Sequence, residues 1–409
     1  MSLEFDKLIN DLDKMASTAV TRRQSRLEIS SRLLQTMDQF AVDWTTIQNA
    51  LEQARELADP KQYRSARPFN HDQPLNSRID PTTPPAQATI IATDGSQILP
   101  DRHAAHLYYL INIGGIIYPH RRGEHDAELS PEPFTVAEFR YPTSEEEAAG
   151  FAIEGGMVSI LRDLKEIGTL ADKAWENRHD APLLLTILDQ RLLYWPVGSP
   201  DAEPNDDIKR WLAGMTKLHD SGALLAGYID RPMTSAAVTL LHTLSGYRDP
   251  AFDWKALGRP GTAGGLSDAV LFSRVLEPGQ RSIVFVGISP ANERFVEYDR
   301  ANEVCFFYMN PGLSGSHIAR VDIPRWVAED DSALAAVHSL IYDQCRILGD
   351  YPYVIARADE MAVVGRQDQE ELNFMIDIYM QRYGIDGAVT AKQSSKGLAR
   401  GGKTRHEGL

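Results

Sequence analysis

The sequence of 409 residues contains only two cysteines, Cys305 and Cys345. Two cysteines at this spacing form neither a zinc-binding motif nor a disulfide framework, and low cysteine content fits a reducing compartment. The sequence has no run of 18 apolar residues, so we expect no membrane-spanning helix. Its acidic first 14 residues lack the basic and apolar regions of a secretory signal. These absences lead us to expect a cytoplasmic protein without a membrane segment.

Several familiar catalytic motifs are also missing. The sequence contains neither H-E-x-x-H nor G-x-S-x-G. The stretch GLARGGKT, residues 397–404, matches the letters of a phosphate-binding loop. Such a loop lies between a strand and a helix, whereas a polar segment precedes this stretch. We therefore interpret residues 391–409 as a basic, flexible tail.

The sequence has a formal net charge of −15, with 43% hydrophobic and 24% charged residues. The composition is that of an ordinary globular protein. A protein that coats nucleic acid non-specifically would be basic, so the charge argues against that class. It does not exclude a nuclease, which needs clustered carboxylates for metal ions and only a local basic groove.

Residues 1–85 are predicted to form a helical region followed by a linker. Apolar residues recur there at three- and four-residue spacing up to about residue 58. A coiled arm, a dimerisation element and a helical layer packed on the core all remain open. The Pro-rich, polar stretch at residues 67–87 predicts an irregular linker.

The pattern changes at residue 88 and predicts an α/β domain over residues 86–390. Three successive strands indicate an antiparallel meander, and later strands separated by helices indicate crossover connections. The predicted strands are 88–99, 106–119, 132–142, 182–195, 223–230, 281–288, 303–311 and 316–324. The predicted helices are 143–175, 205–222, 330–348 and 354–383, with Thr143 or Ser144 as the first N-cap and Gly365 interrupting the last helix.

Two predicted strands carry a carboxylate where apolar residues are expected. Asp94 interrupts TIIATDGSQIL, and Asp189 follows LLLTIL. A carboxylate beside a buried strand is costly unless a cation or hydrogen-bond donors compensate it. Asp94 as a turn residue before Gly95 and Asp189 as a partner of Arg191 remain open alternatives.

A shared divalent cation would explain both carboxylates. Mg²⁺ and Mn²⁺ prefer oxygen ligands, and two-metal phosphoryl chemistry needs several carboxylates at one point. The long predicted helix offers Glu154, whose neighbours are apolar or small. Asp163 and Glu166 are the alternatives on that helix.

The element order resembles the ribonuclease-H-like fold, and the sequence more specifically resembles the NurA nuclease family. The matching stretches, in family order, are IATDGSQI, LLLTILDQRLLYW, LLAGYIDRP, VCFFYMNPG, IARVDIPRWV and GDYPYVIARADEMAVV. The resemblance implies a mixed sheet flanked by helices, with an N-terminal helical region and additional strands and helices. It covers most of the chain, from about residue 90 to residue 370.

The resemblance also implies an activity and partners. NurA-family proteins are manganese-dependent nucleases that cleave single- and double-stranded DNA. They act as homodimers with a hexameric HerA ATPase in end resection during DNA repair. The resemblance therefore implies two Mn²⁺ or Mg²⁺ ions, roughly 3.5–4 Å apart.

The resemblance carries over to five residues. It implies Asp94, Glu154 and Asp189 as metal ligands, and its late Tyr-Pro motif matches Tyr351. Many members carry His eight residues after that Tyr, where this sequence has Asp359, which can still bind a hard metal ion. A second departure is that Gln190 and Arg191 follow Asp189, where the family often has Gly and Ser.

Two other readings of the sequence remain open. The chain could be a NurA-like adaptor subunit with weak or no activity on its ATPase, or a metal-dependent phosphoesterase that acts on a small substrate. Arg320 and Arg357 could contact phosphates. The imperfect alternation around Arg320 does not define its face of the strand, and neither arginine is assigned to the site.

Overall fold

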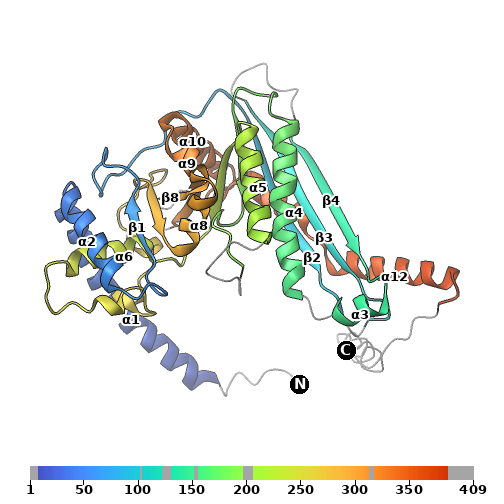
Figure 1. Ribbon diagram of the computed structural model, residues 1–409, viewed down its shortest axis with the longest axis horizontal. Coiled ribbons are helices and arrows are strands. Elements are labelled where there is room, and N and C mark those ends of the chain that lie inside the picture. The colour runs from blue at the N-terminus through green and yellow to red at the C-terminus, as the bar shows by residue number, and fades with distance from the viewer. Residues whose placement is uncertain are drawn as a thin grey trace, which may run out of the picture. The chain divides into compact units, whose positions relative to one another are not determined.

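The computed structural model describes residues 8–101, 104–121, 130–151, 155–196, 206–312 and 317–385. The chain forms two compact units, each built from three stretches of sequence. The first unit comprises Met1–Ala86, Leu188–Asn205 and Leu224–Tyr353, and the second comprises Gln87–Ile187, Asp206–Ala223 and Val354–Leu409. Nine strands are hydrogen-bonded in the order β1-β7-β8-β9-β6-β5-β2-β3-β4. The predicted α/β class, with helices flanking a sheet, is confirmed (Figure 1).

The second unit begins with an antiparallel meander. Its strands are β2 (Gln87–Ile98), β3 (Tyr109–Arg121) and β4 (Glu132–Arg140), followed by β5 (Leu184–Leu188). Ile90, Ile91 and Ala92 of β2 are all completely buried, so both faces of this strand are covered. The following residues 94–97 are only half-buried. The polar end of β2 therefore lies where the covering of the sheet opens.

Two helices pack together beside this meander: α4 (Gly155–Glu176), which contacts β2 and β3, and α5 (Asp206–Asp220) (Figure 1). Helix α5 buries Ile208, Trp211, Leu212, Met215 and Leu218, the three- and four-residue spacing of one helix face. The short α3 (Glu145–Phe151) precedes α4, and Ser144 Oγ accepts the Glu147 N–H at 3.1 Å. Helices α11 (Tyr353–Ala362) and α12 (Arg366–Arg382) end the described chain.

Three predicted elements differ from the structure. The predicted strand 182–195 ends at Leu188, and the apolar Leu192 beyond it is buried without being part of a strand. Strand β1 (Ser65–Pro68) overlaps the start of the predicted linker, for which no strand was expected. The predicted helix 354–383 is broken after Ala362, and Gly365 is the N-cap of the next helix.

The first unit is organised around a larger core. Its strands are β6 (Leu224–Ile229), β7 (Phe285–Ile288), β8 (Val304–Met309) and β9 (Ala319–Pro324), with β1 at the edge. Its helices are α1 (Ile9–Gln39), α2 (Trp44–Leu57), α6 (Ala236–Gly246), α7 (Asp268–Phe272), α8 (Pro290–Tyr298), α9 (Arg325–Ala328) and α10 (Asp331–Leu348). The core joins the C-terminal part of α1 to α2, α6 and the strands. No helix of the described residues is long and apolar enough to span a bilayer.

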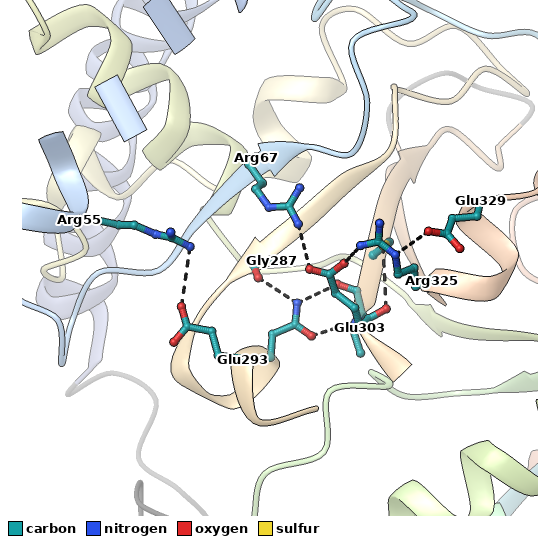
Figure 2. Close-up of polar contacts among 10 residues, drawn as sticks. Arg55, Arg67, Gly287, Glu293, Glu303, Arg325 and Glu329 are labelled. Carbon is teal, nitrogen blue, oxygen red and sulfur yellow. Dashed lines mark hydrogen bonds and ion pairs between the residues drawn. The ribbon is translucent and has the colours of Figure 1, made fainter. Parts of the chain in front are cut away.

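An ion-pair network ties the edge strand β1 to the rest of this unit (Figure 2). Glu303 accepts from Arg67 of β1 at 2.9 Å and also pairs with Arg325 of α9, which in turn pairs with Glu329 at 2.7 Å. The Glu303 side chain is only 10% exposed. A carboxylate so enclosed depends on both cations, because burial of an unpaired charge is costly.

Replacing Glu303 should therefore destabilise the first unit. We expect Glu303→Ala to lower the free energy of unfolding by about 2 kcal/mol, less than a fully buried pair because Arg67 is partly exposed. Glu293→Ala is the matched control: its carboxylate is 63% exposed and lies 3.8 Å from Arg55, so its loss should cost less than about 1 kcal/mol. Urea unfolding measures both. Equal effects of the two variants would contradict the assigned role of Glu303.

Candidate functional site

Two carboxylates meet at the half-buried end of β2. The half-buried carboxyl group of Asp94 lies close enough to the exposed carboxyl group of Asp359, on α11, for the two groups to interact. The same Asp94 carboxylate accepts the N–H of Gly95 at 2.7 Å. Two acidic groups from distant parts of the sequence thus share one small space within the second unit.

Helix α11 reaches this position because β3 carries a glycine there. Gly114 is paired with Asp94 across the β2–β3 ladder. A Cβ atom on Gly114 would lie 2.1 Å from the backbone nitrogen of Ala362. Only a residue without a side chain allows the helix backbone to approach so closely.

Side chains of β2 and β3 fix the C-terminal end of α11. Ser96 Oγ donates to the Ala362 carbonyl at 2.5 Å, and Asn112 Nδ2 donates to the same oxygen at 2.9 Å. The last carbonyls of a helix lack partners within the helix. These bonds supply partners and so hold Asp359 over Asp94.

The contact between the carboxyl groups changes the acidity of Asp94. Burial raises its pKa above the ordinary value, and Asp359 raises it further, because two adjacent negative charges repel. The Gly95 N–H and the more distant Arg162 act in the opposite direction. The Asp94 carboxyl group therefore holds its proton more firmly than an isolated aspartate does.

Helix α4 packs against the opposite face of β2. Thr93 Oγ1 donates to the Glu166 carbonyl at 3.5 Å, and Gln97 Nε2 donates to Ser159 Oγ at 2.9 Å. Between them, a Cβ atom on Gly95 would lie 2.8 Å from Arg162 Cγ. The space beside Gly95 is thus filled by the aliphatic part of Arg162.

Arg162 also interacts with Asp163 and Glu166, the two alternatives to Glu154 as the metal ligand on the long helix. Its Nη2 lies 2.7 Å from Asp163 Oδ1, and it interacts favourably with the buried Glu166. Because successive residues of a strand point to opposite faces, these acids lie on the side of β2 away from α11. Glu154 itself lies outside the described residues.

Three other residues considered in the sequence, Asp189, Tyr351 and Arg320, are found in the first unit. Asp189 directly follows β5 and is exposed. Tyr351 is half-buried, and its ring packs edge-to-face on Tyr228 at 5.5 Å. Arg320 pairs with the fully buried Asp322 at 2.7 Å, so its charge serves the interior of this unit. Arg357, in the second unit, pairs with Glu360 one turn along α11.

The NurA domain model matches residues 88–364 of the chain. The chain belongs to the NurA family. It is also similar to the NurA nuclease from Sulfolobus solfataricus, at 12% sequence identity and a TM-score of 0.43, covering 84% of this chain and 96% of that one. Among curated proteins, no match was found.

The donor set of this NurA chain fits a divalent cation in part. Asp94 and Asp359 offer hard oxygen ligands, and a bound cation would offset the repulsion between their negative charges. Within the described ranges, no group of three or more His, Cys, Asp and Glu side chains is arranged to hold a metal ion. The pair is thus a fitting but incomplete ligand set.

The raised pKa of Asp94 predicts that a neutral residue at this position increases the stability of the fold, by an amount that depends on pH. Folding favours the protonated carboxyl, so wild type loses stability as the pH rises from the ordinary value of 3.8 through the raised folded value. In EDTA, Asp94→Asn should therefore raise the unfolding temperature at pH 7 and leave it almost unchanged near pH 3. Thermal unfolding across this range tests the idea, and a difference that does not vary with pH would contradict it.

The close approach at Gly114 predicts a large cost for a single methyl group. We expect Gly114→Ala to destabilise the protein by about 1–3 kcal/mol, because α11 has to move away from β3. Gly168→Ala is the control: nothing lies within 4 Å of its added Cβ atom, and in the interior of α4 it should stabilise by about 0.5–1 kcal/mol. Urea unfolding should give opposite signs, and a neutral Gly114→Ala would refute the packing described.

Proposed function

We propose that this NurA-family chain is a metal-dependent DNA nuclease, a hydrolase of phosphodiester bonds in single- and double-stranded DNA. The observation that carries the proposal is the contact between Asp94 and Asp359 on two elements that the NurA domain covers. An ionised pair of this kind is unfavourable by itself and becomes favourable around a cation. Membership of the NurA family and the likeness to a NurA nuclease support DNA as the substrate.

The residues take the following roles in this proposal. Asp94 and Asp359 hold a Mn²⁺ or Mg²⁺ ion, and Asp189 and Glu154 are the further metal ligands that the NurA family implies. When bound, two ions of this kind activate water and stabilise the leaving oxygen of a phosphodiester. Tyr351 orients the scissile phosphate. Asp359 replaces the family's frequent His by an oxygen ligand, which suits a hard cation.

The biological setting is part of the same proposal. We infer that the chain acts as a homodimer with a HerA-like hexameric ATPase, in the end resection of DNA breaks in the cytoplasm. Family membership supports this setting. An inactive adaptor subunit on the same ATPase is the competing function, and the following experiment separates the two.

Cleavage of labelled DNA should depend on both carboxylates. Wild type should cut single- and double-stranded DNA with Mn²⁺ or Mg²⁺ and not with EDTA. Asp94→Asn and Asp359→Asn should each lower the rate by at least about 100-fold, since even residues behind the ligands often cost 10–100-fold. Asp172→Asn is the control, because Asp172 is exposed on α4 and pairs with Lys217.

The proposal is contradicted if wild type cuts neither single- nor double-stranded DNA with Mn²⁺ or Mg²⁺, whether or not its ATPase is present. That result would favour the adaptor function. Cleavage that survives both Asp94→Asn and Asp359→Asn would instead place the active site elsewhere.

A further inference from the structure

The segment that carries Asp189 is held by two neighbouring strands of the first unit. The N–H of Leu192 donates to Asp322 Oδ2 at 3.1 Å. On the adjacent strand β6, a Cβ atom on Gly227 would lie 2.3 Å from the carbonyl oxygen of Gln190. The backbone of residues 190–192 therefore lies directly against β6 and β9.

The two holding residues work as a pair. Gly227 and Asp322 are cross-strand partners in the antiparallel β6–β9 ladder. Because Gly227 has no side chain, the Gln190 carbonyl lies in the space that a Cβ atom would fill, and Asp322 on the next strand meets the Leu192 N–H. Any larger residue at position 227 would push the segment away.

The orientation of the Asp322 carboxylate is itself fixed. Its Oδ1 accepts from Arg320 Nε at 2.7 Å, and the Arg320 guanidinium lies over the Phe306 ring, 3.8 Å from its centroid. Asp322 has no exposed surface. A carboxylate in this position needs both donors, because an unpaired buried charge is costly. Its two oxygens are thus engaged in holding other groups.

We propose that Asp322 and Gly227 are positioning residues for the carboxylate of Asp189. The inference rests on the proposed role of Asp189 as a metal ligand. Asp189 is exposed and lies between β5, which ends at Leu188, and residues 190–192, so the way in which these residues are held contributes to its location. Metal ligands work only when their location is fixed to about 0.5 Å. Asp322 and Gly227 supply this constraint without touching the metal ion.

The direct test is the binding of Mn²⁺ to the metal-free protein, measured by titration calorimetry without DNA. We expect Gly227→Ala and Asp322→Asn to weaken binding by about 10–100-fold, the usual cost of losing support behind a ligand. Asp322→Asn keeps the number of non-hydrogen atoms, but its amide has one acceptor oxygen for two donors. In cleavage assays, the Mn²⁺ concentration for half-maximal rate should rise by a similar factor.

Two reference variants make the result interpretable. Gly287→Ala adds the same methyl group to strand β7, where its nearest neighbours lie at 3.9 Å, and it should bind Mn²⁺ like wild type. Asp189→Asn should bind Mn²⁺ at least as weakly as the two positioning variants. Thermal unfolding shows which variants are folded.

The outcomes distinguish a failure of the positioning role of Asp322 and Gly227 from a failure of the ligand role of Asp189. If Asp189→Asn loses binding while a folded Gly227→Ala or Asp322→Asn keeps wild-type affinity, the positioning role is wrong and the proposed function stands. If Asp189→Asn itself binds Mn²⁺ like wild type, the ligand role of Asp189 fails and the inference falls with it. If neither positioning variant folds, both residues serve the whole unit and the inference is likewise overturned.

Discussion

The contact between Asp94 and Asp359 is the interaction on which the account of this protein depends. It requires a helix to lie unusually close to a strand, and the structure achieves this by placing Gly114 beside Asp94 and by binding the end of α11 to Ser96 and Asn112. Without a bound cation, the contact raises the pKa of Asp94 and is unfavourable when both groups are ionised. Gly114, Ser96 and Asn112 maintain this contact, and the cation that we propose would make the interaction of the two carboxylates favourable.

The same arrangement appears twice, once in each compact unit. In the second unit, Gly114 lets the backbone of α11 approach, and polar side chains hold its carbonyls. In the first unit, Gly227 lets the backbone after β5 approach, and Asp322 holds its N–H. In both cases a glycine and at least one polar side chain determine where a carboxylate-bearing segment lies. The locations of the acids proposed for catalysis thus depend on residues that have no proposed contact with the metal ion or the substrate.

Some features of the fold and of the candidate site were predictable from the sequence and others were not, for physical reasons. Asp94 was recognisable because a charge in an apolar strand is costly and needs a partner, and Asp359 followed from the resemblance. Gly114 gave no signal, because its importance comes from a helix far along the chain. Strand β1 was missed because prolines indicate a linker, yet Pro68 is compatible with an edge strand. Leu192 was assigned to a strand for its apolar character, although it is buried in a segment outside any strand.

The central claim is that the two carboxylates hold a divalent cation, and anomalous X-ray diffraction from crystals grown with Mn²⁺ tests it most directly. The account predicts an anomalous peak in contact with carboxylate oxygens of both Asp94 and Asp359, at the distances of about 2.0–2.6 Å typical of hard cations. Crystals of Asp94→Asn should lack this peak. Saturating Mn²⁺ that leaves the two carboxyl groups in direct contact, with no peak between them, would contradict the account.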